Sequence, residues 1–327
     1  MTVAEDFAAA VAAGRAVDTP EEQKRVRDLA AAGPQALSVA VGHLADPDPV
    51  VRSTACRLLG AVAELHDDLR ADVATVLLDR ARVEIDPAVL WSLARALGDT
   101  RDARAVPVLV ELAGHGDPDV RYMVATALPW ILDDDPDSPG LAALLALCRD
   151  DEVSVRDWAT YGLGQVSTAD GAAVRAVLWE RVNDEDEDVR AEAVRGLAHR
   201  RDPRAVPLVA DLLQEPEFNA FNTIAAGLLG DPSLAPLLVA YAPDEDSVAD
   251  HLRECDPDRR TRRDDFAFAL FDAVAAGRGG VALYGRRCEI GLTLAVGERT
   301  WSVEDLLDDT GGDPGRAARL VLDEPPA

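Results

Sequence analysis

Asp46-Pro-Asp-Pro-Val-Val-Arg52-Ser-Thr-Ala-Cys-Arg-Leu-Leu-Gly60 is the stretch that decides the fold, because altered copies of it recur along the chain. Copies with the same turn and arginine are Asp117–Pro129, Asp151–Gly164 and Asp186–Ala198, and degenerate copies are Asp86–Gly98 and Phe218–Gly230. The positions equivalent to Arg52 are 52, 90, 121, 156, 190 and 222, spaced 31 to 38 residues apart. Such a period is typical of stacked helix pairs. The sequence therefore predicts an all-α repeat array.

Local sequence within each repeat predicts a helix, a tight turn and a second helix. Aspartates in the Asp-Pro-Asp pieces can accept hydrogen bonds from free N–H groups at a helix start, where their charge also suits the helix dipole. The segments Arg104–Leu112 and Arg204–Leu213 carry proline in a predicted first turn, where the missing N–H costs little. These features agree with the helix-pair interpretation.

The pattern Asp-Pro-(Asp)-x-Val-Arg followed by Ala-x-x-Leu-Gly resembles the HEAT-repeat family, most closely its short, phycobilin-lyase-like variety, over about residues 35–241. The resemblance implies a right-handed α-solenoid of about six helix pairs. It also implies a structural ladder between neighbouring units, formed by repeated aspartates and by four arginines: Arg52, Arg121, Arg156 and Arg190. Leu90 and Asn222 lack the arginine, so we expect the ladder to be interrupted there.

Three regions are predicted: capping helices over 1–34, the solenoid over 35–242, and a non-repeat cap with helices and a β-hairpin over 243–327. The elements expected in this last region are a helix capped by Asp244–Ser247 and running through Leu252, an amphipathic helix over Asp264–Ala276, strands over Val281–Tyr284 and Glu289–Val296 joined through Gly285–Arg287, and a final helix from Val303 or Pro314.

The net charge limits the classes of partner that are expected. The chain of 327 residues carries a formal charge of −27, and Lys24 is its only lysine. A field of that sign repels phosphate backbones and anionic membranes, so neither nucleic acid nor a membrane is expected, and a basic protein or peptide is favoured. The acidic runs Asp133–Asp135 and Asp184–Asp188 are interpreted as solvated edges, with a docking surface for a basic partner as the alternative. The basic run Arg259–Arg263 is interpreted as a loop salt-bridged to the acidic body.

The sequence shows no motif that predicts a targeting signal or a cofactor site. The N-terminus is acidic where a signal peptide would be basic, and apolar runs are too short to span a bilayer, so a cytoplasmic monomer is expected. The four cysteines lack a CxxC spacing and are interpreted as buried residues, and the five histidines are scattered. No metal, cofactor or catalytic residue is predicted.

Candidate binding residues follow from the family resemblance, which implies that the second helix of each unit lines a concave groove. In the copy 51–62, Val51, Ala55, Leu58, Leu59 and Val62 form an apolar stripe, and positions 53, 57, 60 and 64 lie opposite. Transferring this register gives the candidate groove residues Arg57, Trp91, Arg95, Tyr122, Asp157, Tyr161 and Arg195. Tryptophan, tyrosine and arginine are the types enriched at binding hot spots.

The other tryptophans receive structural interpretations. Trp158 is expected on the flank of its helix, packed against the next repeat, while Trp130 and Trp179 are assigned to the core. If the register slips by one residue in the degenerate copies, Trp91 also turns inward.

Three classes of enzyme have a HEAT or HEAT-like fold. Deoxyhypusine hydroxylases need His-Glu pairs at the start of the Leu-Gly helices, and this sequence has none there, which excludes that activity. Phycobilin lyases share the repeat, but nothing in the sequence implies a pigment. Alkylpurine DNA glycosylases use groove residues like Trp91, Tyr122, Asp157 and Tyr161, with Asp157 placed to stabilise an oxocarbenium-like state, but the charge opposes duplex binding.

The sequence thus predicts a non-enzymatic scaffold or adaptor that binds a protein or peptide in the groove. Two alternatives stay open: an acidic antagonist or immunity protein that neutralises a basic enzyme, and the DNA glycosylase.

Overall fold

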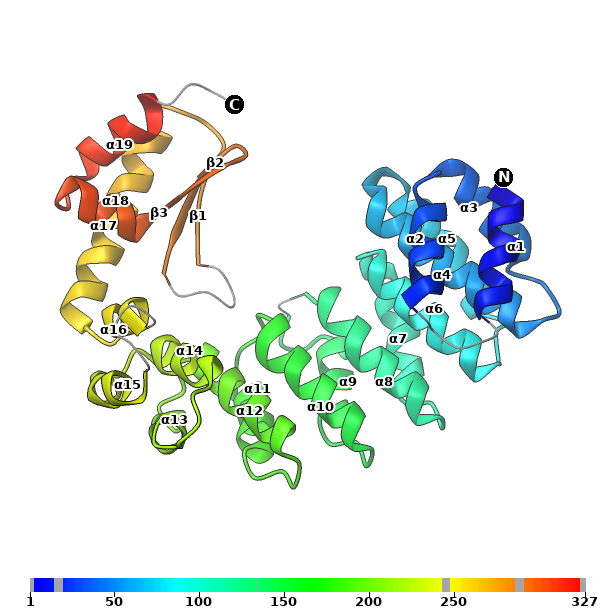
Figure 1. Cartoon of the computed structure of the whole chain (residues 1–327), viewed down its shortest axis with the longest axis horizontal. Helices are drawn as coiled ribbons and strands as arrows, with labels where there is room; N and C mark the ends of the chain where they lie inside the picture. The colour runs from blue at the N-terminus through cyan, green and yellow to red at the C-terminus, as the bar shows by residue number, and fades with distance from the viewer. Residues whose placement is uncertain (1–2, 15–19, 134, 243–247, 286–290, 324–327) are drawn as a thin grey trace. The chain divides into compact units, whose positions relative to one another are not determined.

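The computed structural model describes residues 3–14, 20–133, 135–242, 248–285 and 291–323 (Figure 1). The chain forms two compact units, Met1–Glu192 and Ala193–Ala327. Cys56, Cys148 and Cys255 are buried free thiols in these described parts.

The first unit consists of helices in two rows. Its helices are α1 (Val3–Gly14), α2 (Pro20–Ala30), α3 (Pro34–His43), α4 (Pro49–Leu65), α5 (Arg70–Ala81), α6 (Pro87–Asp99), α7 (Val106–Leu112), α8 (Pro118–Ala127), α9 (Pro139–Leu147), α10 (Val153–Tyr161), α11 (Ala172–Arg181) and the start of α12 (Glu187–His199). Helices α2, α4, α6, α8 and α10 pack side by side, each on the next, and form what we call the even row. Helices α3, α5, α7 and α9 each pack against the even-row helix that follows them.

Aspartate fixes where α4, α6 and α8 begin. The side chains of Asp48, Asp86 and Asp117 accept hydrogen bonds of 2.9, 3.0 and 2.9 Å from the backbone N–H two residues further on. A proline follows each of these aspartates at the first helical position, where it has no N–H to satisfy. These three Asp-Pro pairs are therefore N-cap devices.

The glycine of the Leu-Gly pattern lets neighbouring helices approach closely. A Cβ at Gly60 would lie 3.1 Å from the Cα of Ala96 on α6, and one at Gly98 would lie 2.7 Å from the Cβ of Ala127 on α8. The leucines beside these glycines, Leu59 and Leu97, are fully buried. The pattern thus serves helix-to-helix packing along the even row.

Arginines at the fourth helical position anchor the turns of their own repeats. Arg156 Nη1 donates to the carbonyls of Asp150 and Asp151, at 2.8 and 3.1 Å. The same two contacts, to the carbonyls six and five residues earlier, are made by Arg52, Arg121 and Arg190.

Three of these arginines also reach the turn that precedes a later even-row helix or α12. Arg52 donates to Glu84 (3.0 and 3.1 Å), Arg121 to Asp150 (2.7 and 2.8 Å) and Arg156 to Asp184 (both 3.2 Å). Each carboxylate also accepts a backbone N–H of its own turn, as Asp184 does from Asp186 at 3.1 Å. A single side chain thereby ties the turn to the preceding repeat.

The Leu90 repeat differs on both sides of this contact. Leu90 is 5% exposed and apolar. In the corresponding turn of the next repeat, His115 stands where the others have a carboxylate, and its Nδ1 accepts the N–H of Asp117 at 3.1 Å. Arginine and carboxylate are thus replaced together, so neither charge is left buried without its counterpart.

The second unit contains the end of α12, further helices and a small sheet. Its elements are α13 (Ala205–Leu212), α14 (Ala220–Leu229), α15 (Ala235–Tyr241), α16 (Ala249–Glu254), α17 (Pro257–Ala275), β1 (Val281–Tyr284), β2 (Thr293–Val296), β3 (Arg299–Ser302), α18 (Val303–Thr310) and α19 (Pro314–Asp323). The antiparallel sheet has the order β1-β2-β3, with Val281 opposite Val296 and Thr293 opposite Ser302. The helical solenoid with a small β-containing C-terminal segment is therefore confirmed.

Several details of the second unit differ from the prediction. A third strand, β3, follows the hairpin, and α17 begins at Pro257, earlier than the predicted Asp264, because Asp256 caps it. The run Arg259–Arg263 consequently lies in a helix and not in a loop. Its salt bridges do form: Arg259 contacts Asp308 at 3.0 Å, and Arg263 pairs with Glu254.

The last repeat shifts by one residue. The side chain of Asn219 caps α14, which makes Thr223 and not Asn222 the equivalent of Arg52. Residues 244–247, predicted to cap a helix, and 286–290, predicted to lie in the hairpin, fall outside the described residues, and α16 extends past the predicted Leu252 to Glu254.

Candidate functional site

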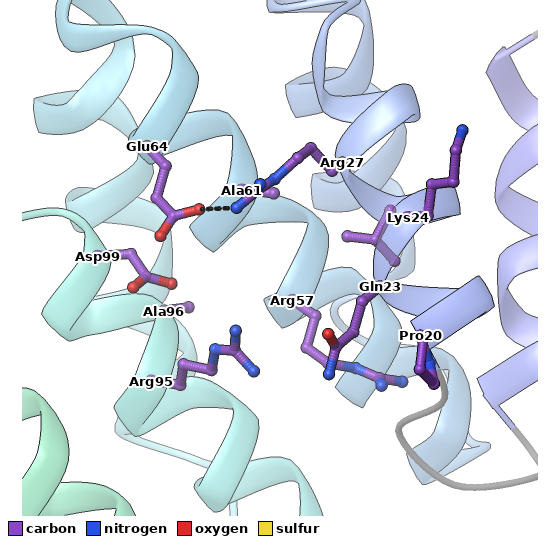
Figure 2. Close-up of a pocket in the computed structure, with 11 residues that line it drawn as sticks. Pro20, Gln23, Lys24, Arg27, Arg57, Ala61, Glu64, Arg95, Ala96 and Asp99 are labelled. Carbon is purple, nitrogen blue, oxygen red and sulfur yellow. Dashed lines mark ion pairs between the residues drawn. The ribbon is translucent and has the colours of Figure 1, made fainter.

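Two adjoining cavities lie along the even row of the first unit. The smaller cavity, about 310 Å³, is lined by α2, α4 and α6 (Figure 2). The larger, about 640 Å³, extends to residues of α8 and α10. They share four lining residues, Arg27, Glu64, Arg95 and Asp99. We call the two cavities together the basic groove.

Basic side chains outnumber acidic ones in this groove, although the protein is strongly acidic. The basic lining residues are Lys24, Arg27, Arg57, Arg70, Arg95 and Arg101, whereas the acidic ones are Glu64 and Asp99. Arrays of arginine in a partly enclosed space focus a positive potential even when the net charge is negative. The groove is therefore suited to an anionic group.

Some of these cations are already engaged, whereas Arg95 is not. Arg27 lies 3.7 Å from Glu64, and Arg57 Nη2 donates to Thr54 Oγ1 at 3.2 Å. Arg95 is exposed and makes no hydrogen bond or ion pair within the described part of the chain. Figure 2 shows its guanidinium group extending from α6 towards the side of the cavity where Arg57 and Gln23 lie.

Asp99 lies one helical turn beyond Arg95 and has unusual proton affinity. Burial, and then repulsion from Glu64, raise the pKa of Asp99 to about 7, although Arg95 and Arg101 act in the opposite direction. Its carboxylate packs over Gly60, where an added Cβ would lie 2.5 Å from Oδ2. No described residue forms a hydrogen bond or ion pair with it. Near neutral pH this carboxyl group gains and loses a proton at the floor of the groove.

Apolar side chains line the far end of the larger cavity. Trp130 is 56% exposed, Leu65 47% and Trp158 39%. Trp158 packs edge-on against Tyr122 on α8 and Tyr161 on α10, with ring centroids 6.0 and 5.6 Å apart. Rings held by one another lose little freedom on binding, so this end can receive an apolar side chain at low entropic cost.

The predicted groove residues fall into three places. Arg57 and Arg95 line the smaller cavity of the basic groove. Tyr122 and Tyr161 flank Trp158, and the half-buried Asp157 helps burial to raise the pKa of Tyr122. Trp91 is half-buried on α6, and Arg195 belongs to the second unit, where its guanidinium lies 4.5 Å from the ring centre of Phe221.

Other assignments from the sequence were wrong. Trp130 is exposed and not core. Trp158, which was expected to pack on the next repeat, is exposed, and its ring contacts are with Tyr122 of the preceding repeat and Tyr161 of its own helix. Gly60 faces α6 and is buried, so it does not point outward. Asp184, placed in a solvated acidic run, is buried against Arg156.

Four residues that line the groove were not predicted from the sequence as binding residues: Lys24, Arg27, Asp99 and the exposed Trp130. Lys24 and Arg27 lie on α2, outside the repeats whose register was transferred. Asp99 could have been identified from the sequence, because it follows Arg95 by four residues and therefore shares its helix face. Within the described residues, no cluster of His, Cys, Asp and Glu is arranged to hold a metal ion, and no helix has the length and apolarity to cross a bilayer.

Comparison with known families fits this architecture. Residues 74–164 and 174–255 match the family described as HEAT repeats, and residues 36–66 match the single HEAT repeat. These matches span more than half of the chain, and the chain belongs to the HEAT-repeat family.

Individual relatives show the fold without giving an activity. Protein YibA of Escherichia coli (strain K12) is 32% identical over 102 residues, which cover 31% of this chain and only 36% of YibA. The X-ray structure of E. coli YibA superposes with a TM-score of 0.59 at 22% identity, over 75% of this chain and 90% of YibA. The complex of CpcE and CpcF of phycocyanin lyase from Nostoc sp. PCC7120 has a TM-score of 0.44 at 20% identity, over 67% of this chain and 85% of that one.

Proposed function

We propose that this chain is a non-enzymatic interaction module that binds a segment of another protein along the basic groove of its first unit. The observation that carries the proposal is Arg95, an arginine without a hydrogen-bond or ion-pair partner among the described residues, directed into a cavity that continues to exposed tryptophans. HEAT arrays commonly use such extended helical surfaces for binding.

Residue types and dimensions support a polypeptide ligand. Arginine and tryptophan are the side chains that most often dominate the energy of protein interfaces. The groove crosses residues from α2, α4, α6, α8 and α10, a length that suits an extended segment better than one small molecule. The helices beneath it are tied by partly buried turn contacts such as Arg121–Asp150, so the surface is preorganised.

The negative charge of the whole chain favours a second candidate, an antagonist that neutralises a basic enzyme through acidic surfaces outside the groove. The two functions make different predictions about which surface matters. A groove variant impairs the interaction module, whereas it leaves the antagonist's binding unchanged. The glycosylase alternative predicts release of alkylated purines from DNA and loss of that release in Asp157→Asn.

Affinity capture from an extract of the native cell tests the proposal, with three forms of the full chain compared. These are the wild type, the groove variant Arg95→Glu/Trp158→Ala, and the control Arg82→Glu. Arg82 is an exposed arginine after α5 that lines neither cavity, and its substitution changes the charge as Arg95→Glu does. We expect proteins retained by the wild type and the control to be lost by the groove variant. Equal retention by all three forms would exclude the groove as the binding surface.

A further inference from the structure

Charge in the basic groove is opposite to that of the whole protein, and this contrast bears on the ligand. The chain carries 60 acidic and 33 basic residues, so basic clusters are not expected by chance on its surface. In the smaller cavity, however, Lys24, Arg27, Arg57 and Arg95 face Glu64 and Asp99 only. Arg27 is offset by Glu64 and Lys24 by Asp28, whereas Arg95 has no hydrogen-bond or ion-pair partner among the described residues and can attract a ligand.

We propose that the groove binds an acidic segment of a partner protein, with one carboxylate among Arg27, Arg57 and Arg95 and an apolar side chain against Trp130 and Trp158. This inference rests on the proposed function and names its ligand class. It reverses the expectation of a basic partner that the overall charge suggests.

Geometry favours a carboxylate group within the cavity. Guanidinium groups bind carboxylates through paired, charge-assisted hydrogen bonds, and here they come from three different helices, α2, α4 and α6 (Figure 2). A volume of about 310 Å³ accommodates one or two side chains, not a folded surface. The apolar end, with Trp130 and Trp158, lies in the adjoining cavity that shares Arg95. Acidic and apolar side chains on one extended segment satisfy both cavities.

Two other occupants are less well matched. A nucleic acid would place successive phosphates near the chain, and these are repelled by its net charge of −27. A second copy of this chain would bring acidic segments of its own, such as Glu304-Asp305 at the start of α18. This occupant differs from a partner protein in a measurable way, since it makes the protein a dimer in the absence of other molecules.

Selection from a random display library of peptides, performed on the full-length protein, tests the inference. We expect enrichment of peptides that combine Asp or Glu with Trp, Phe or Leu. A selected peptide is then labelled and its affinity measured by fluorescence anisotropy for the wild type, Arg57→Glu, Arg95→Glu and the control Arg82→Glu. Loss of about tenfold in affinity or more in both groove variants, no change in the control, and weakening with salt would support the inference.

Other results overturn it. Enrichment of Lys- or Arg-rich peptides, an unchanged affinity in Arg57→Glu and Arg95→Glu, or failure to select any peptide would each contradict an acidic ligand. Tighter binding of a single-stranded oligonucleotide than of the selected peptide, or a dimer in light scattering that Arg95→Glu dissociates, would assign the groove to those occupants instead. Neutral or basic peptides whose binding is lost in Trp158→Ala would leave the interaction module intact and reject only its ligand class.

Discussion

Arg156 on α10 donates two hydrogen bonds of 3.2 Å to the two carboxylate oxygens of Asp184, 28 residues later in the turn before α12. Both side chains are buried, at 9% and 3% exposure. Through its other nitrogen, Arg156 holds the turn of its own repeat. One residue thus couples two turns, which explains how the first unit keeps successive helix pairs in register.

Arg156→Ala should destabilise the first unit strongly. It leaves the carboxylate of Asp184 buried with fewer partners, and breaking a buried ion pair costs about 3 kcal/mol or more. We expect chemical denaturation to show a loss of that size. The matched control is Arg149→Ala, whose 2.7 Å pair with Glu180 is nearly half exposed and should contribute less than about 1 kcal/mol. Equal effects of the two substitutions would contradict a ladder that stabilises the array.

Glu84 should make stability sensitive to acid. Burial raises the pKa of Glu84, but hydrogen bonds from Arg52, Arg80 and backbone N–H groups outweigh it and bring the pKa to about 2, below the ordinary 4.5. A depressed folded pKa stabilises the protein above the unfolded pKa, and that contribution is lost as the pH falls from about 4.5 towards 2. Urea denaturation across this range should show the decline.

Glu84→Gln provides the comparison for this acid effect. Its free energy of unfolding should be lower at neutral pH and should fall less steeply between about pH 4.5 and 2 than that of the wild type. Parallel curves for the two proteins would mean that Glu84 titrates alike in the folded and unfolded states.

Gly98→Ala should destabilise the packing of α6 against α8. The new methyl group would lie 2.7 Å from the Cβ of Ala127 and 3.1 Å from its Cα, so a helix must move, and overpacking of this kind costs about 1–3 kcal/mol. Gly42→Ala is the control: it is helical, and nothing lies within 4 Å of the added Cβ. There the better helix propensity of alanine should raise the melting temperature. A neutral Gly98→Ala would show that the approach of α6 and α8 is not tight.

The repeat could be predicted from sequence because its signals are local. Spacing located the arginines, and Asp-Pro pairs marked the starts of α4, α6 and α8. The register transferred along the repeats placed Arg57 and Arg95 opposite the apolar stripe, and both line the smaller cavity. Trp130 could not be placed in this way. Helix α8 ends at Ala127, and Leu128–Trp130 forms a 3₁₀ turn that contains Pro129, which breaks the 100° register.

The other features of the candidate site depend on contacts between helices that are distant in the sequence. Arg27 comes from α2, a helix outside the repeat pattern, and no periodicity relates it to Arg95. Asp99 shares a helix face with Arg95 and could be placed, but its proton affinity depends on the approach of α6 to Gly60 and on Glu64 of another helix. The basic character of the groove therefore arises from the way the helices pack, and it cannot be predicted from the amino-acid composition.

Asp99→Asn should stabilise the protein at alkaline pH and remove a pH dependence of ligand binding. Burial and Glu64 raise the folded pKa of Asp99 from 3.8 to about 7, so the folded state is progressively destabilised as the pH rises between these values, and fully so above about 7. The groups that face this carboxyl are Glu64 on α4, Arg95 on α6, Arg101 after α6 and Arg27 on α2. One pKa unit corresponds to about 1.4 kcal/mol, so relief of half the shift adds about 2 kcal/mol at about pH 8 and nothing below about pH 4. Denaturation at both pH values measures this.

An acidic peptide should bind the wild type more tightly at about pH 6 than at about pH 8, because the neutral carboxyl no longer repels it, whereas Asp99→Asn should bind equally at both. If the wild type and Asp99→Asn keep the same ratio of affinities at the two pH values, Asp99 does not titrate beside the ligand.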